Sequence, residues 1–348
     1  MPKLLKDLVK ATEIATYIQN VPSNSIMPLG AALFPAKKKL GLDLKWIKGA
    51  NQLPVALKPA AFDAKAPVRD RQGFSEVQHD MPFFRESMMV DETLRQQLAP
   101  LLAAGNEAYK VLIERIFDDA KTLVDGADVQ PERMRFQLLT TGKIGIQVDG
   151  KDPIDYDYGH DTNLKEVLAG TAKWDAPATS NPVLDFVRWK KAVAAKGGAV
   201  TRAIMNSNTV AQLSASESIR KDMNPLGAAN IILTDEDVKA YIKRKTGISI
   251  AIYDKLFVDE QGATKQFVPD GVVSLIPDGT LGNTWYGTTP EELDAIALKG
   301  IADVKVVNTG VAVTTRATVD PVSVQTIVSE IVMPSFERIN EIFIATTY

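Results

Sequence analysis

A long helical tract constrains this chain more than any other stretch of its sequence. Apolar residues recur at intervals of three and four between Asn106 and Val124, which places them in one stripe along a helix. The opposite face is charged, and Lys110 and Glu114 lie one turn apart, where opposite charges can meet. The pattern predicts a helix with one buried face. The stripe consists of Tyr109, Leu112, Ile113, Ile116, Phe117, Ala120, Leu123 and Val124.

Two residues predict an interruption after this stripe. Gly126 is a poor helix former, and Asp128 with Pro131 three residues later has the form of a new helix start. A second helical segment is expected to continue in the same direction and to include the apolar residues Met134, Leu138 and Leu139.

A hairpin is predicted directly after the helix. Gly142 can take the left-handed conformation that ends a helix, and the apolar residues then recur at every second position. Residues 143–148 and 154–158 alternate in this way, and Asp149 with Gly150 supplies a tight turn between them.

The residues at this junction resemble a known family of shell proteins. Residues 133–144 (RMRFQLLTTGKI) and 154–159 (IDYDYG) resemble the end of the spine helix and the following strands in major capsid proteins of lambda-like tailed phages. The family is called phage major capsid protein E. Shorter resemblances lie at 28–30, 33–35, 174–175, 181–185, 320–322 and 333–335. They imply an α+β chain with the Hong Kong 97-type capsid fold.

The resemblance also implies a division of the chain. An N-terminal arm (1–36) precedes the first strand and an extended loop (37–90). A peripheral domain with spine helix and hairpin (91–173), an axial domain (174–318) and return strands of the peripheral domain (319–348) follow. The core of the spine helix is then expected at Leu112, Ile113, Ile116 and Phe117.

The extended loop is the candidate inter-subunit contact. Residues 48–84 show no helical stripe and are broken repeatedly by Pro and Gly, which in a compact domain marks a functional loop or a wrong assignment. The residues alone favour a solvated surface loop. The resemblance instead implies a loop that lies across a neighbouring subunit. Its expected contact residues are Trp46, Phe62, Lys65, Arg69, Arg71 and Phe74.

Other local patterns predict elements on both sides of this tract. A short amphipathic helix is expected over 4–19, with a partner that need not lie in the same chain, and an extended arm over the Pro-containing residues 20–35. Alternation predicts strands at 42–46, 248–252, 272–276 and 322–329, and residues 341–348 are expected to add a last strand. Residues 203–205 predict another short strand and 208–213 a helical turn.

Three more helix starts are visible. Asn181 precedes Pro182 as a cap, and Leu184, Val187 and Ala194 are expected to face inward until Gly197 ends the helix. Residues 234–237 form a capping box for a helix that ends at Gly247, and Thr289 with Pro290 opens a helix to Leu298.

Composition excludes several classes of function. With 348 residues the chain can hold two subdomains, and its hydrophobic (45%) and charged (24%) contents are those of a globular protein. There is no cysteine, which excludes disulfides and thiolate metal sites. Tight binding to nucleic acid requires clustered Lys and Arg, which a net charge of −3 does not favour. Any relation to DNA is therefore expected to be enclosure of the DNA and not tight binding. The first 19 residues lack a secretory pattern and no apolar run fits a bilayer, so we expect cytoplasmic assembly.

No catalytic, metal or cofactor site is predicted. Only His79 and His160 are available for a histidine-dependent site, and no nucleophile elbow or phosphate loop occurs. Residues 155–166 superficially match a calcium loop, but Gly159 and His160 replace required residues. The acidic run 235–237 is explained by a helix start, and 37–39 by a solvated edge.

The expected function is that of a structural subunit. The chain is expected to assemble with itself into pentamers and hexamers of an icosahedral virion shell that encloses double-stranded DNA. Portal, scaffold and decoration proteins are expected partners, and a membrane is not. The alternatives are an encapsulin-like protein shell and, ranked lower, an enzyme built on an α+β domain.

Overall fold

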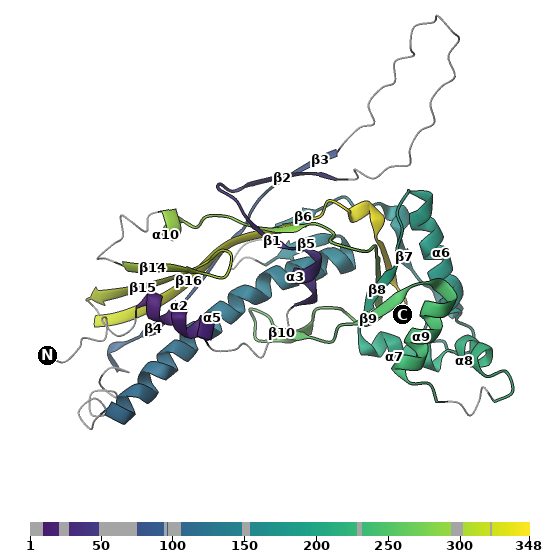
Figure 1. Cartoon of the computed structure of the whole chain (residues 1–348), viewed down its shortest axis with the longest axis horizontal. Coiled ribbons are helices and arrows are strands. Elements are labelled where there is room, and N and C mark those ends of the chain that lie inside the picture. Colours follow the sequence, from purple (N-terminus) through teal and green to yellow (C-terminus); the bar gives the residue numbers. More distant parts are fainter. Residues whose placement is uncertain are drawn as a thin grey trace, which may run out of the picture. The chain divides into compact units, whose positions relative to one another are not determined.

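The computed structural model is a mixture of helices and strands (Figure 1). It describes residues 10–20, 28–48, 75–93, 96, 106–147, 154–227, 232–293, 302–320 and 322–348. Only the backbone is described at 19–20, 48, 75–76, 106–115, 302 and 319. The expected helix turns at 4–9, the hairpin turn at 149–150 and the helix end at 294–298 therefore lie outside the described residues.

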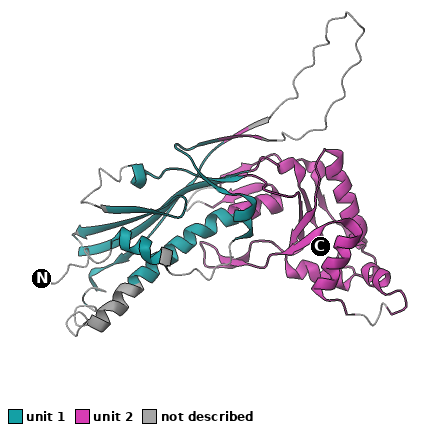
Figure 2. Cartoon of the chain, viewed as in Figure 1, with its two compact units in different colours: residues 1–44, 79–133, 283–335 teal, residues 45–78, 134–282, 336–348 magenta. Residues whose placement is uncertain are grey.

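Two compact units make up the chain (Figure 2). Unit 1 comprises Met1–Leu44, His79–Arg133 and Asn283–Ser335, and unit 2 comprises Lys45–Gln78, Met134–Gly282 and Phe336–Tyr348. Each unit is thus assembled from three separate segments. The domain boundaries implied by the resemblance divide the chain differently and stay a prediction.

A six-stranded sheet forms the frame of unit 1. Its order is β1 (Ala36–Lys38), β13 (Asn283–Tyr286), β16 (Val322–Ser335), β15 (Val311–Val319) and β14 (Ala302–Val307), and β4 (Phe83–Val90) also pairs with β16. All pairings are antiparallel except that of β1 with β13.

The central strand β16 is more deeply buried than its alternating pattern suggested. Of the three valines expected on one face, Val324 and Val328 are buried but Val322 is 44% exposed, and Ser329, expected on the opposite face, is buried as well. Its hydroxyl donates a hydrogen bond to Glu291 at 3.1 Å. Every residue from Thr326 to Ser335 is buried, so the polar positions do not mark a solvent face.

The long helix α5 (Asn106–Thr141) is continuous, so the predicted interruption at Gly126 is wrong. Pro131 lies inside the helix, where it removes one backbone hydrogen bond. Pro131 and Glu132 are buried, and Glu132 accepts a hydrogen bond from the Gly30 amide at 2.9 Å. These tertiary contacts outweigh the local cost. Asp128 caps no new helix and instead accepts hydrogen bonds from the Asn308 amide group.

The N-terminal segment is partly helical. Helix α2 (Ala11–Asn20) confirms the amphipathic prediction over its described part, and it finds its partners in unit 1. The expectation of a wholly extended arm is wrong for Leu29–Leu33, which form the short helix α3. Gly30 and Leu33 are buried in it, because apolar contacts compensate for the Pro-rich surroundings.

Unit 2 is built on a five-stranded sheet and four helices. The strand order is β7 (Lys165–Val167), β17 (Phe343–Thr346), β12 (Val272–Ile276), β8 (Arg202–Met205) and β9 (Ser249–Ile252). The helices are α6 (Pro182–Ala195), α7 (Ser207–Ala215), α8 (Glu217–Met223) and α9 (Asp235–Thr246). The strands β9 and β12 confirm predictions from alternation, and β8 and β17 confirm the short strands expected at 203–205 and 341–348.

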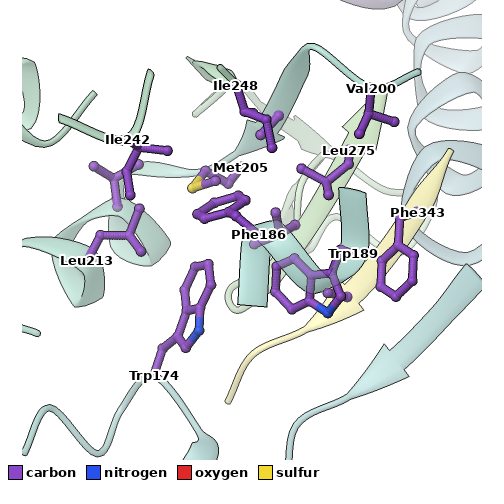
Figure 3. Close-up of a cluster of buried hydrophobic side chains, with 14 of the residues drawn as sticks. Trp174, Phe186, Trp189, Val200, Met205, Leu213, Ile242, Ile248, Leu275 and Phe343 are labelled. Atoms are coloured by element: carbon purple, nitrogen blue, oxygen red, sulfur yellow. The ribbon is translucent and has the colours of Figure 1, made fainter. Parts of the chain in front are cut away.

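The core of unit 2 is rich in aromatic rings (Figure 3). Trp189 lies with its ring centroid 5.6 Å from those of Phe186 and Phe343 and 5.8 Å from that of Trp174. All four side chains are buried, and such aromatic pairs stabilise a core beyond the area they bury.

Helix α6 has the predicted ends but not the predicted face. Asn181 accepts a hydrogen bond from the Leu184 amide, as a cap should. Leu184, however, is 61% exposed, and the buried face is formed by Pro182, Asp185, Phe186, Trp189 and Val193. The two large aromatic side chains bury more apolar area than Leu184 and Ala194 would, so they set the orientation.

Smaller elements complete the two units. The predicted hairpin of β5 (Lys143–Ile146) and β6 (Ile154–Asp157) is present, and so is the capping box at the start of α9. Two strands inside the region expected to be loop were not predicted: β3 (Ser75–Asp80), which pairs with β2 (Asp43–Lys48), and β4. The remaining elements are β10 (Leu256–Val258), β11 (Thr264–Gln266), α10 (Pro290–Leu293), η1 (Thr162–Leu164), η2 (Gly170–Ala172) and η3 (Ile339–Glu341).

Candidate assembly surfaces

The base of the expected extended loop is held by a buried aromatic contact. Trp46, on β2, is only 7% exposed, and its ring centroid lies 5.0 Å from that of Tyr158. Burial raises the pKa of the Tyr158 hydroxyl well above its usual value, so it stays neutral. Trp46 thus packs inside its own chain. The other expected contact residues, Phe62, Lys65, Arg69, Arg71 and Phe74, lie outside the described residues.

The seam between α2 and α5 contains part of the expected spine-helix core. Ile116 is buried among apolar residues of α2, α5, β14, β15 and β16, and Phe117 packs at the edge of this cluster. The ring of Tyr17 lies 5.4 Å from that of Phe117, and its hydroxyl donates a hydrogen bond to Asp118 at 2.7 Å. Leu112 and Ile113 lie on α5, but their side chains are outside the described residues.

The C-terminal end of α5 is closely fitted. Gly142 has a φ of +74°, and a Cβ there would lie 2.9 Å from the Cβ of His160. Lys165 donates a hydrogen bond from Nζ to the carbonyl oxygen of Thr141 at 2.6 Å, which satisfies a terminal carbonyl of the helix. Burial lowers the pKa of Lys165. The sequence predicted the glycine here but not its two neighbours, because they come from a different part of the chain.

His160 is a structural histidine. Its Nε2 lies 3.3 Å from the carbonyl oxygen of Ile342, and Nδ1 is buried without a hydrogen-bond partner. Burial lowers the pKa of this imidazole to about 4. It is therefore neutral near pH 7, and its surroundings include no arrangement for catalysis.

A charged network covers one side of the unit 2 core. Arg188 pairs with Glu166 at 2.9 Å and with Asp185 at 2.9 Å. The indole N–H of Trp174 donates to Asp185 at 2.9 Å, and that of Trp189 donates to Glu166. Burial raises the pKa of Asp185, while the Trp174 hydrogen bond and Arg188 act against this rise. The network satisfies the polar groups of two buried tryptophans, which is a structural role.

Charged side chains of the calcium-like segment 155–166 and of the basic run 37–39 form ion pairs within the described part of the chain. Asp157 of the calcium-like segment pairs with Lys143 at 2.8 Å, which lowers the pKa of Asp157. Within the described ranges, no group of three or more His, Asp or Glu side chains is placed to hold a metal ion. Lys38 of the basic run pairs with Glu292.

Among the described helices, none is both long and apolar enough to span a bilayer.

Exposed apolar side chains mark surfaces that the sequence did not single out. Leu40, Leu42 and Phe83 are exposed in unit 1, as is Met89 on β4. In unit 2 the exposed side chains are Val167, Leu184, Leu226, Ile232, Leu256 and Val258. Exposed apolar groups of this kind are candidates for contacts between proteins. Their exposure depends on the folded orientation of each element, which periodicity alone does not give.

Comparison with known proteins decides what these surfaces belong to. The model of the family described as "Phage major capsid protein E" matches residues 10–347. The chain belongs to this family. It is therefore a capsid subunit, a structural protein and not an enzyme. Among curated protein sequences, no significant match is found.

Solved structures of capsid proteins share the fold. A putative capsid protein of a prophage of Escherichia coli CFT073 aligns with a TM-score of 0.61 at 13% identity, over 98% of this chain and 99% of that one. A phage-related protein from Bordetella bronchiseptica RB50 gives 0.55 at 13% identity, with 97% of each chain covered. The capsid asymmetric unit of cyanophage A-1(L) gives 0.50 at 10% identity, over 93% and 94%.

The family match confirms the main predictions from sequence. The resemblance to this family, the α+β capsid fold and the structural role are all supported by it. It also favours a phage capsid over an encapsulin-like shell and rules against the enzyme alternative. The contact residues expected in the extended loop stay a prediction.

Proposed function

We propose that this capsid protein assembles with copies of itself into pentamers and hexamers that close into an icosahedral shell around double-stranded DNA. The observation that carries the proposal is the family match over residues 10–347, which includes segments of both compact units. Assembly takes place in the cytoplasm of a bacterial host, and the product resides in the virion.

The extended loop supplies contacts that a compact unit cannot make. In this proposal Phe62, Lys65, Arg69, Arg71 and Phe74 contact a neighbouring subunit, while Trp46 anchors the base of the loop against Tyr158. The burial of Trp46 supports the anchoring role, since a fixed base gives a long segment a defined direction. Many modest interfaces in a closed shell add up to a durable whole.

Further parts of the proposal concern the division of the chain and its partners. The arm, extended loop, peripheral domain, axial domain and return strands divide the chain at the boundaries given by the resemblance. Portal, scaffold and decoration proteins bind the shell. DNA is enclosed without sequence-specific contacts, which fits the net charge of −3, because strong binding to phosphates requires clustered cations.

Electron microscopy of the purified protein tests the proposal. Closed particles, or capsomer rings that convert to particles when concentrated, are the expected result. Sedimentation should show the same material as a large species. A soluble monomer over a wide range of concentration, with no particles under any assembly condition, would contradict the proposal.

A further inference from the structure

Leu226 and Ile232 are the most exposed large apolar side chains among the described residues. Both lie on the connection between α8 and α9 in unit 2, and Ile232 is 93% exposed. Contacts within the described part of the unit leave these side chains uncovered. Side chains this exposed are available for a contact with another molecule.

Two exposed acidic side chains follow Ile232 within four residues along the chain. Asp235 and Glu236 occupy the first turn of α9 and are both exposed. Glu236 also pairs with Lys239 at 2.9 Å, but its side chain stays 84% exposed, and the third acidic residue, Asp237, forms the capping box with Thr234. We call Leu226, Ile232, Asp235 and Glu236 the α9 start surface.

The opposite end of the same helix is basic. Lys243 and Arg244 are exposed in the last turn, and neither forms an ion pair with another described residue. Their neighbours are already paired: Lys245 contacts Asp222 at 2.7 Å, and Lys190 donates to the carbonyl oxygen of Thr246 at 2.8 Å. We call Lys243 and Arg244 the α9 end surface.

These two surfaces are complementary but cannot meet within one chain. Helix α9 has 12 residues, so its ends are about 18 Å apart. Charges at the ends of a helix interact favourably with its dipole, which explains their sign. The dipole does not explain two uncovered apolar side chains beside the acidic end.

We propose that the α9 start surface of one subunit binds the α9 end surface of a second copy of the chain. The inference rests on the proposed function and names one contact of the shell. A contact between unlike surfaces of identical subunits is what closes a ring. The α9 start surface contains both apolar and acidic side chains, and Lys and Arg can contact both kinds. Their methylene stems cover apolar groups while their charges reach carboxylates.

Charge exchange between the two ends tests this contact. One variant carries Asp235→Lys and Glu236→Lys, a second carries Lys243→Glu and Arg244→Glu, and a third combines all four substitutions. The fraction of protein in particles is measured by sedimentation and microscopy. Each single-surface variant should lose at least tenfold in particle yield, because like charges then face each other. The combined variant restores opposite charges and should recover most of the yield.

Replacement of the apolar pair tests the other half of the surface. Leu226→Ser with Ile232→Ser should also reduce the yield severalfold with all charges intact. Unchanged particle formation in this variant would overturn the proposal. So would loss at the basic end with no effect at the acidic end, which would assign Lys243 and Arg244 to another partner, such as nucleic acid phosphates.

Folding controls keep the test decisive. Circular dichroism melts are recorded for every variant, because reversed charges oppose the helix dipole. If the reversed variants do not fold, neutral ones decide: Asp235→Asn with Glu236→Gln, and Lys243→Gln with Arg244→Gln. Neutral or reversed variants that fold and assemble as the wild type does would overturn the proposal, as would a folded combined variant that does no better than the single ones. Failure of the wild-type protein to form particles would instead contradict the proposed function.

Discussion

At the scale of the residue, the predictable features are those that depend on neighbours in sequence. Gly142 was expected to end the long helix, and it does so with a φ of +74°. Thr234 was expected to open a capping box, and its hydroxyl accepts a hydrogen bond from the Asp237 amide at 3.2 Å. Gly126 and Pro131 misled the prediction. Pro131 is buried, and its neighbour Glu132 accepts a hydrogen bond from the distant Gly30 amide, so tertiary contacts hold α5 together there, while the exposed Gly126 is simply tolerated inside the helix.

Two glycines of α5 and its end should respond in opposite ways to alanine. Gly142→Ala should destabilise the fold by about 1–2 kcal/mol or more, because its φ is left-handed and a Cβ would collide with His160. Gly126→Ala lies in the helix interior with no atom within 4 Å of the new Cβ, and should stabilise it by about 0.5–1 kcal/mol. Denaturant titrations of both variants measure this. Changes of the same sign would contradict the assigned conformations.

His160 should make the fold sensitive to acid. Its pKa is about 4 in the folded protein, and its usual value of 6.5 applies to the unfolded chain. Between these values the unfolded chain binds a proton and the folded protein does not, so stability falls as pH drops from 6.5 towards 4. The maximum loss is about 3 kcal/mol. In His160→Gln, this part of the pH dependence should vanish.

Thermal melts between pH 7 and pH 4.5 separate the two proteins, with the assembly state held constant. The melting temperature of the wild type should fall more steeply than that of His160→Gln. Parallel curves would show that His160 does not titrate as its burial indicates.

At the scale of the element, existence was easier to predict than orientation. The ends of α6 follow from Asn181, Pro182 and the glycines after it, all of which act locally. Its buried face does not, because Phe186 and Trp189 are selected by a core that also contains Phe343 from the end of the chain. Strand β4 was missed for a related reason: its exposed residues and single paired neighbour give no alternating pattern.

The buried face of α5 gives a test with a matched pair of substitutions. Ile116→Ala removes apolar atoms from the seam with α2 and should cost about 2–5 kcal/mol. Asp119→Ala, on an exposed position less than one turn away, should change stability by no more than about 0.5 kcal/mol. Equilibrium unfolding of both variants measures the difference. Comparable losses of unfolding free energy in the two variants would show that the buried face of the helix has been assigned wrongly.

At the scale of the whole molecule, composition and resemblance predicted the class but not the assembly of each unit. Strand β16 pairs with β4, which lies more than 200 residues earlier in the chain. Such long-range pairings leave no local signal in the sequence. The periodicity of apolar residues therefore could not predict which segments make up each unit. The short motifs that carry the resemblance, such as residues 133–144, lie where the long helix gives way to a hairpin.

The extended loop is where fold and assembly should separate. Residues 49–74 lie between β2 and β3 in the sequence, and these two strands pair with each other. Replacement of these residues by a Gly-Ser segment of equal length should therefore leave a folded subunit. The same replacement removes Phe62, Lys65, Arg69, Arg71 and Phe74, and should abolish closed particles because the proposed bridge to a neighbour is lost.

Circular dichroism and microscopy distinguish the possible outcomes of this replacement. A variant with wild-type secondary structure and melting behaviour that forms no shells is the expected result. As a matched control, Ala substitution of only Lys65, Arg69 and Arg71 keeps both aromatic side chains and should reduce particle yield less than the full replacement does. Normal particles from the Gly-Ser variant would show that the loop has no bridging role, because nothing of its side-chain chemistry would then be required.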